Sequence, residues 1–426
     1  MINIFILELV KEIWRPESEL YKKIYNENVN KNVHILYSEI IAEINRKAVK
    51  GINDGIYVEN ILETMGCTYC NKNGSFCGCS MCDWDSLYIS LMAQMNVLRS
   101  KDVKLYTKAV CYSFKIVRGE NVIGNAIEEI AIHNAFCSWQ MPDELLKELF
   151  KDNVIYKRNP AVGILQARAD SICVERIRLW KKNFAKVISI SIGVETGNEW
   201  IRNHWLNKNI SNKQIIEALH LIKSEGANTN ANVLLGIPGY TEKQSIVEFE
   251  DTIGWLYNNN DIDLITVSPL VTRRKTIQGM LHNGNKHKKN AEPIMLISMF
   301  MALYIVLCKY PGIENKIVLS PPNCKSFFDQ EYIYNDGKYT DLENEILLFL
   351  QSLTNMRESK RIKQITSMEI IKNPIYVEYY ESVQKQRGKE YEQLQLYECA
   401  KHLACKIWDD ENYNKITKFK EELTER

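Results

Sequence analysis

The feature of this 426-residue chain that most limits its fold is an alternation of short β-rich runs with amphipathic helical stretches from Gly55 to about Val271. Such alternation is typical of βα units, in which parallel strands form one sheet and helices cover it. One helix is well marked, because Ser211 can cap its start and Gly226 can end it in a left-handed conformation. We expect six strands, at Ile56–Glu59, Glu129–His133, Val162–Gln166, Val187–Val194, Ala231–Leu235 and Leu264–Val267. The predicted fold is an α/β partial (β/α)6 barrel of parallel strands, similar to a TIM barrel.

The segments on either side of this region differ from it in pattern. Residues 1–54 place apolar side chains at helical spacing and carry no recognisable chemistry, so we expect a helical N-terminal extension. Residues 55–282 would form the partial barrel. Residues 283–426 begin as a mixed segment and then become charged and helix-prone, which predicts a mainly helical C-terminal accessory region.

Bulk composition narrows the class of protein. Lysine plus arginine number 54 and aspartate plus glutamate 53, so no net field attracts a polyanion such as tRNA or DNA. The longest apolar stretch, Ile294–Cys308, is shorter than the ~20 residues of a membrane-spanning helix and predicts a buried core helix. The first ten residues lack the basic start and cleavage site of a signal peptide. We therefore expect a cytoplasmic protein without membrane contact, whose cysteines serve metal binding more readily than disulfides.

Five of the twelve cysteines fall within sixteen residues, in the string GCTYCNKNGSFCGCSMCDW at residues 66–84. Several thiolates on one loop can share a soft metal centre, and the string alone fits a zinc site and an iron–sulfur cluster equally. Its position directly after the first predicted strand favours a catalytic cluster, because active sites of βα barrels form at the carboxyl ends of strands. The candidate ligands are Cys79 and Cys82 with Cys67 as the third, and Cys70 is the alternative to Cys67.

Two glycine-containing turns follow later predicted strands. The string GVETG at residues 193–197 ends the fourth strand, and GIPG at residues 236–239 ends the fifth. A carboxylate such as Glu195 at a strand end can accept hydrogen bonds from ribose hydroxyls or an ammonium group, while the glycines let backbone approach a ligand closely. The alternative for Glu195 is an acid that interacts with the dipole of the following helix.

Together these elements resemble the radical S-adenosylmethionine (SAM) superfamily, in which a Gly-x-Glu-Ser/Thr-Gly turn precedes a helix, a strand and a Gly-x-Pro-Gly turn. Further likenesses point to the branch of the elongator-type catalytic subunit and the archaeosine-biosynthesis radical SAM lyase. They lie at residues 66–82, 134–136, 166–168, 268–276 and 322–324. The resemblance spans roughly residues 55–330, and the chain departs from the branch where Asn134 and Lys275 replace glycines.

The resemblance implies a 4Fe–4S cluster held by three cysteines, with one iron left open for the amino and carboxylate groups of SAM. It implies reductive cleavage of SAM to a 5′-deoxyadenosyl radical, which abstracts hydrogen from a small-molecule or peptide substrate in lyase, mutase or group-transfer chemistry. An electron donor such as flavodoxin or ferredoxin would be needed. The residues expected to bind SAM are Asn134, Glu195, Thr196, Gly236, Ile237 and Pro238.

Arg168 and Arg274 are the candidate catalytic residues, because arginines at strand ends can bind a carboxylate or phosphate through bidentate hydrogen bonds. Structural ion pairing is the equal alternative for each. A second hypothesis is a tRNA nucleoside-modifying radical SAM enzyme, which the near-neutral charge disfavours. A third is a zinc-stabilised binding protein, which explains the cysteines but neither the βα alternation nor the two turns.

Overall fold

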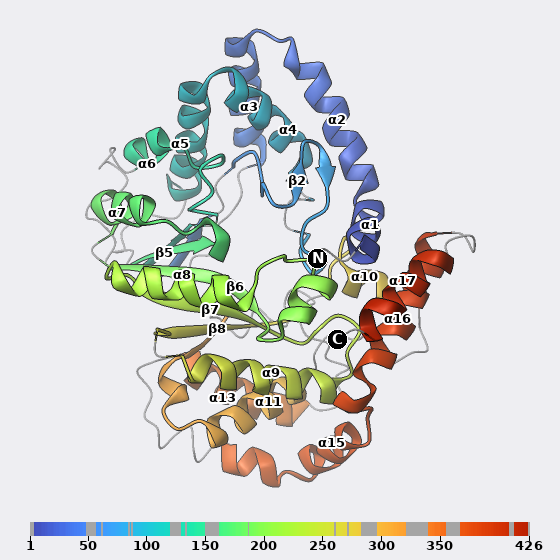
Figure 1. Cartoon of the computed structure of the whole chain (residues 1–426). Helices are drawn as coiled ribbons and strands as arrows, with labels where there is room; N and C mark the ends of the chain where they lie inside the picture. The colour runs from blue at the N-terminus through green and yellow to red at the C-terminus, as the bar shows by residue number, and fades with distance from the viewer. Residues whose placement is uncertain are drawn as a thin grey trace.

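A computed structural model gives the fold of residues 4–47, 57–60, 63–83, 86, 88–119, 129–132, 134–149, 162–185, 187–259, 261–270, 272–282, 296–320, 340–354, 367–408 and 413–424. Its centre is a seven-stranded sheet in the order β1-β4-β5-β6-β7-β8-β9, and every pair of neighbours is parallel. The strands are β1 (Tyr57–Asn60), β4 (Glu129–Ile132), β5 (Val162–Ala167), β6 (Val187–Glu195), β7 (Asn228–Leu235), β8 (Leu264–Pro269) and β9 (Ile317–Leu319). Helices surround this sheet in Figure 1.

The six predicted strands correspond to β1 and to β4 through β8, which confirms the parallel α/β architecture. The predicted count is one short, because β9 pairs with β8 as a seventh strand. Three residues are too few to show the alternation on which a strand prediction rests. Ile56 and His133, at the ends of two predicted strands, lie outside the described residues, as does the segment 322–324.

The main hydrophobic core, here called the sheet core, lies between one face of the sheet and the helices that follow its strands. These helices are α7 (Val174–Asn183), α8 (Asn212–Ser224), α9 (Glu242–Tyr257) and α11 (Leu296–Lys309). Alternate strand residues such as Ile190, Val233 and Val267 are buried in it, since side chains of a strand alternate between its two faces. The buried helix expected at Ile294–Cys308 is confirmed as α11.

The helix signals around α8 are also confirmed. The Ser211 side chain accepts a hydrogen bond from the Gln214 amide, and the Gln214 side chain bonds back to the Ser211 amide, forming a capping box. At the other end Gly226 adopts φ +67°, a left-handed conformation that costs glycine no steric strain.

The N-terminal segment is helical as expected, with α1 (Ile4–Ile13), α2 (Arg15–Val29) and α3 (Val33–Lys47). Before β4 the chain adds α4 (Ile89–Lys101) and α5 (Val103–Gly119), and α6 (Asp143–Glu148) follows β4. In the C-terminal third the described helices are α13 (Thr340–Thr354), α15 (Pro374–Gln384), α16 (Glu392–Ile407) and α17 (Tyr413–Thr424). The domain boundaries at residues 54 and 282 remain predictions.

A second core, here called the edge core, lies beyond the carboxyl ends of the strands. It joins α1 to α16 and α17, to the short helix α10 (Ile277–His282) and to a small hairpin in the cysteine loop. Figure 1 shows α1 in blue beside α16 and α17 in red, so segments from opposite ends of the chain meet here. Among the described helices, none combines the length and apolar character needed to cross a membrane.

Candidate active site

The cysteine loop is built around a two-stranded hairpin of β2 (Asn71–Lys72) and β3 (Ser75–Phe76). Its turn residues Asn73 and Gly74 adopt φ 53° and 84°, as a tight two-residue hairpin turn requires. At the base of the hairpin the Cys77 amide donates to the Cys70 carbonyl at 2.8 Å. The hairpin therefore takes up the long interval between Cys67 and Cys79 and leaves Cys70 and Cys77 paired across its base.

The five thiols of this loop differ in burial. Cys70 and Cys77 are buried, Cys67 and Cys79 are partly exposed, and Cys82 is exposed. Burial raises the pKa of the Cys77 thiol, which disfavours the thiolate that binds metals. The three more accessible thiols are thus those of the three favoured ligand candidates.

Gly78 packs tightly against one of the buried cysteines. A Cβ atom at this position would lie 2.9 Å from both Cβ and Sγ of Cys70. Cys70 itself belongs to the edge core together with Phe76. Close packing therefore holds the Cys70 side chain on the core side of the loop.

The fit of a metal cluster to this loop rests on the chemistry of its donors. Within the described residues, no three cysteine, histidine or carboxylate side chains converge closely enough to hold one metal ion. Five soft sulfur donors in sixteen residues are nevertheless the kind of ligand set that iron–sulfur clusters and zinc take. The donor set fits a thiolate-bound centre, and binding one would draw ligands of the loop together.

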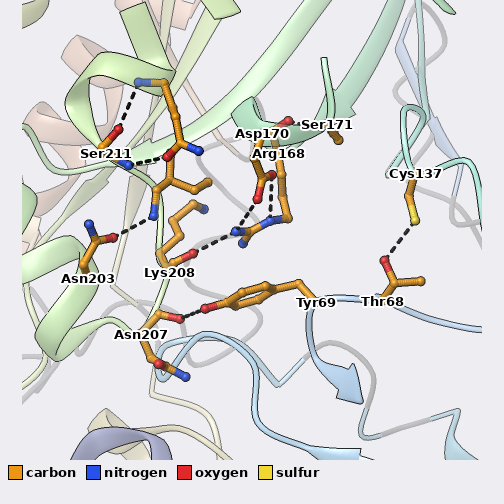
Figure 2. Close-up of polar contacts among 12 residues, drawn as sticks. Thr68, Tyr69, Cys137, Arg168, Asp170, Ser171, Asn203, Asn207, Lys208 and Ser211 are labelled. Atoms are coloured by element: carbon orange, nitrogen blue, oxygen red, sulfur yellow. Dashed lines mark hydrogen bonds and ion pairs between the residues drawn. The ribbon is translucent and has the colours of Figure 1, made fainter. Parts of the chain in front are cut away.

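The segment after the GVETG turn clamps the cysteine loop. The Asn207 side-chain amide donates to the carbonyls of Cys77 at 3.0 Å and Gly78 at 2.8 Å. In return the Tyr69 hydroxyl donates to the Asn207 carbonyl at 2.5 Å, as Figure 2 shows. A further bond joins the Ser80 amide to the Leu206 carbonyl at 2.9 Å. The loop after β1 and the loop after β6 therefore form one hydrogen-bonded unit.

Glu195 ends β6 in a strained conformation. Its φ of 63° is uncommon for a residue with a side chain, and the pairing of β6 with β7 shifts register between Gly193 and Glu195. Such an irregularity at the carboxyl end of a strand redirects a side chain, and strain of this kind often marks a functional site. The Glu195 carboxylate forms an ion pair with Lys208 at 2.5 Å, with 13% and 8% of the two side chains exposed.

Gly193 makes room for this ion pair. A Cβ atom at position 193 would lie 2.4 Å from Nζ of Lys208 and 2.7 Å from Oε1 of Glu195. A side chain at the first glycine of the GVETG turn would therefore displace the Lys208–Glu195 ion pair.

A residue that the sequence reasoning missed, Arg202, fixes the turn that contains Thr196. It lies in a short π-helix (Ile201–Trp205), is fully buried and donates to the carbonyls of Val194, Thr196 and Ile210. Burial lowers its pKa to about 10. No short motif marks this arginine, since its role depends on the carbonyls that the folded turn presents to it.

Thr196 is anchored a second time, from helix α9. Its hydroxyl donates to the carboxylate of Glu248, a buried residue whose pKa is raised by burial. The backbone at the end of β6 is therefore held from the following loop and from α9, and Thr196 itself is fully enclosed.

The two candidate catalytic arginines occupy different environments. Arg168 stacks on Tyr69 with 3.7 Å between its Cζ and the ring centroid, and pairs with Asp170 at 3.2 Å. It also donates to the Lys208 carbonyl at 2.8 Å (Figure 2). Burial lowers the pKa of Arg168, but Cys79 and Asp170 outweigh it and leave the value raised. Arg274 is exposed, and its neighbour Arg273 pairs with Asp83 at 3.2 Å, so the segment of Arg274 also lies beside the cysteine loop.

The GIPG turn after β7 faces the edge core. Gly236 has φ 105°, Ile237 is buried, and the Pro238 carbonyl accepts a 2.8 Å bond from the Trp205 indole. The Gly239 carbonyl accepts a 2.8 Å bond from the Gln395 side chain on α16. The C-terminal helices therefore hold this turn directly.

The loop after β4 also reaches the cysteine loop. Asn134 begins it with φ 51° and a partly exposed side chain, and the next amide, that of Ala135, donates to the Gln166 carbonyl at 2.8 Å. Farther along, Cys137 Sγ and Thr68 Oγ1 lie 2.9 Å apart (Figure 2). The strand ends of β4, β5 and β6 thus meet the loop that follows β1.

The sequence has a weakly similar relative among known proteins. No family model matches the sequence. An uncharacterised protein of Methanocaldococcus jannaschii is 24% identical over 239 residues, which are 54% of this chain and 59% of that protein. The chain thus spans less than two thirds of that relative.

Two solved structures with partly similar folds have low sequence identity to this chain. TsrM, a radical SAM methyltransferase from Kitasatospora setae solved with tryptophan and a SAM analogue, gives a TM-score of 0.39 at 10% identity, over 72% of this chain and 63% of TsrM. The archaeal Elp3 of Methanocaldococcus infernus gives 0.34 at 14% identity, over 53% of each chain. Because both scores are below 0.5, we base the functional conclusion on the chain's own residues.

Proposed function

We propose that this chain is a radical SAM enzyme that binds a 4Fe–4S cluster through the cysteine loop and SAM across the carboxyl ends of β4, β6 and β7. The observation that carries the proposal is the clamp between the two loops. Asn207, which follows the GVETG turn, bonds to the carbonyls of Cys77 and Gly78. The cysteine loop and the loop that follows the GVETG turn, proposed to serve the cluster and SAM, are therefore joined by hydrogen bonds at the carboxyl ends of the strands.

The proposed cluster ligands are Cys67, Cys79 and Cys82, with Cys70 as the alternative to Cys67. Burial supports the first set, because Cys67 and Cys79 are partly exposed and Cys82 is exposed, whereas Cys70 is buried. A buried thiol in an apolar cluster resists loss of its proton, and thiolates are the form that binds iron.

Asn134, Glu195, Thr196, Gly236, Ile237 and Pro238 are the residues proposed to line the SAM site. Glu195 can accept hydrogen bonds from ribose hydroxyls or from the ammonium of SAM, since its second carboxylate oxygen has acceptor capacity beyond the Lys208 contact. Asn134 lies at the neighbouring strand end with a partly exposed amide. Gly236 follows β7 and has no Cβ atom, so a ligand can approach the backbone closely there.

When bound, the reduced cluster supplies the electron that splits SAM into methionine and a 5′-deoxyadenosyl radical able to abstract hydrogen from substrate. The protein's part is to hold both groups in fixed relation and to restrict water. Arg168 is the candidate for contact with an anionic group, because its guanidinium lies between Tyr69 and Asp170 beside the cysteine loop. Arg274 keeps the same proposed role at an exposed position.

The proposed substrate is a small molecule or peptide, and the reaction belongs to the lyase, mutase or group-transfer classes. An electron donor of the flavodoxin or ferredoxin type would reduce the cluster. The near balance of 54 basic and 53 acidic residues supports a small substrate over tRNA, and a cytoplasmic location accords with such a reductant.

The test is anaerobic reconstitution with iron and sulfide, followed by addition of dithionite and SAM. We expect about four irons per chain and formation of 5′-deoxyadenosine. Cys67→Ala, Cys79→Ala and Cys82→Ala should abolish both, whereas Cys70→Ala and Cys77→Ala are matched controls on the same loop and should retain both. Zinc in place of iron would overturn the proposal. Loss of the cluster in Cys70→Ala but not in Cys67→Ala would show that Cys70, and not Cys67, is the third ligand.

A further inference from the structure

The face of the sheet opposite the sheet core has an unusual composition. Along β6, Ile188, Ile190 and Ile192 point into the sheet core, so the alternate residues lie on the other side, here called the inner face. On β5 through β8 the inner face carries the neutral polar residues Gln166, Ser189, Ser191, Asn230, Asn232, Thr266 and Ser268, beside the apolar residues Val162, Ile164, Val187, Leu234 and Leu264. The interior of a closed βα barrel is instead filled mainly by branched apolar side chains.

These polar side chains form a connected row across three strands. The Asn230 amide donates to the Ser191 hydroxyl at 2.8 Å, and the Thr266 hydroxyl donates to the Asn230 amide oxygen at 3.0 Å. Asn230 is thereby fixed with a known orientation, its oxygen toward β8 and its nitrogen toward β6. Ser191 accepts in this contact and keeps its own O–H as a donor.

Next to this row, one hydroxyl has no partner. Ser189 is 3% exposed, and its Oγ makes no hydrogen bond to any described residue. Ser189 lies two residues before Ser191 on β6 and therefore on the same face. A buried hydroxyl without a protein partner is destabilising, so Ser189 has a free donor and acceptor for a group that arrives from outside the chain.

On β5 through β8, charge lies at only one end of the inner face in the described residues, whereas the positions of Glu129 on β4 and Glu59 on β1 fall on the same face by register. At the carboxyl end, Lys208 and Glu195 form an ion pair over Gly193. Between that pair and the amino ends of the strands, β5 through β8 place only uncharged side chains on this face in the described residues. Burying an anion or a cation against the part of this face formed by β5 through β8 would leave its charge without a counter-ion, whereas a neutral hydrogen-bonding group would find both donors and acceptors there.

We infer that the inner face binds the reacting part of the substrate, and that this part is a small uncharged group bearing several hydroxyls or amides. The inference deepens the proposed function, because it assigns the substrate of the same site a chemical class. Ser189 and Ser191 would contact the substrate, while Asn230 and Thr266 orient Ser191. A lipid chain or a buried phosphate is excluded as the reacting part.

The test needs neither cluster nor SAM. The full chain without iron is screened by ligand-observed NMR against three sets of fragments of equal size, namely neutral polyols and amides, carboxylates and phosphates, and apolar alcohols. We expect the neutral polyols and amides to dominate the binders. Their affinity should fall at least fivefold in Ser189→Ala and in Thr266→Val. In Ile265→Val, a matched change on the opposite face of β8, affinity should stay unchanged.

Thermal melting separates a binding role from a structural one. Ser189→Ala removes an unpartnered buried hydroxyl, so it should melt at the same temperature or higher while binding weakens. Dominance of anionic or apolar fragments, or unchanged binding in Ser189→Ala, would overturn the inference. A chain that binds no iron but shows the expected fragment pattern would contradict the proposed function alone, so the two failures are distinguishable.

Discussion

The sheet core and the edge core are assembled in opposite ways. In the sheet core, strands and the helices that directly follow them bury alternating or helically spaced residues, as in β6 and α8. In the edge core, side chains come from both ends of the chain, and Phe419 of α17 stacks on Phe5 of α1 at 4.9 Å. The first core supplies the scaffold, whereas the second supports the cysteine loop through Phe76 and Cys70. The difference indicates that the position of the cysteine loop depends on the edge core, whose residues lie far apart in the sequence.

The largest effects should come from a matched pair of tryptophans, one in each core. Trp14 and Trp180 are both 1% exposed, and their indoles donate to the carbonyls of Lys275 at 3.1 Å and Ala135 at 3.3 Å. Replacement of either by alanine should lower the free energy of unfolding by about 3–5 kcal/mol, as measured by urea denaturation.

The two tryptophan variants should differ in the cysteine loop. Trp14 stacks on Phe76 at 5.4 Å, next to Cys77, so Trp14→Ala should speed the alkylation of Cys70 and Cys77 under native conditions. Trp180→Ala should leave those rates near wild type. Equal rates in the two variants, followed by mass spectrometry of labelled peptides, would remove the distinction between the cores.

A smaller effect should separate two helix caps. Ser211 caps α8 through contacts within its own turn, whereas Thr241 caps α9 and also donates to the Arg387 carbonyl at 2.9 Å. Ser211→Ala should cost about 1 kcal/mol, and Thr241→Ala about 2 kcal/mol because the hydrogen bond to the C-terminal region is lost too. Urea unfolding measures both, with Thr241→Ser as the conservative control. Equal costs would argue that the C-terminal contact contributes nothing.

The smallest expected effect is a pH dependence at the end of β6, where Glu248 of α9 accepts a hydrogen bond from Thr196. Burial raises the pKa of Glu248, which accepts the hydrogen bond of Thr196, so the folded state binds this proton more tightly than the unfolded chain. That contribution is fully present below the unfolded pKa and is lost as pH rises through the folded value. Glu248→Gln should therefore be more stable relative to wild type at pH 8 than at pH 5.

The exposed Glu217 on α8 provides a control for the pH experiment. Glu217→Gln measures the effect of losing an exposed carboxylate charge at each of the two pH values. A Glu248→Gln difference that stays constant between pH 5 and pH 8 would contradict the role assigned to the buried carboxylate.

The sheet could be predicted because its signals are local. The strand β6 reads as alternating isoleucine and small residues, and the cap at Ser211 and the end at Gly226 are properties of a few consecutive positions. The strand β9 could not be predicted, because its three residues are too few to show an alternation of apolar and polar side chains. The cysteine loop and the two glycine turns were found by their strings, and the fold brings their strand ends to one edge.

The interior of the site could not be predicted in the same way. Arg202 is an arginine within a run that reads as an ordinary helix start, and its value as a fivefold donor depends on carbonyls brought together by the fold. Lys208 looks like a solvated surface charge until Glu195 and Gly193 are placed beside it. The hairpin that separates Cys70 and Cys77 from the other thiols likewise appears only once Asn73 and Gly74 turn the chain.

The meeting of α1 with α17 also sets an order of events during synthesis. The cysteine loop is complete at residue 82, but the helix that carries Phe419 begins at residue 413. At roughly 5–20 residues per second, that separation corresponds to roughly 20–70 seconds of translation. During that interval the nascent chain presents the cysteine loop before α17 completes the edge core, so the buried thiols Cys70 and Cys77 are more accessible during translation than after folding.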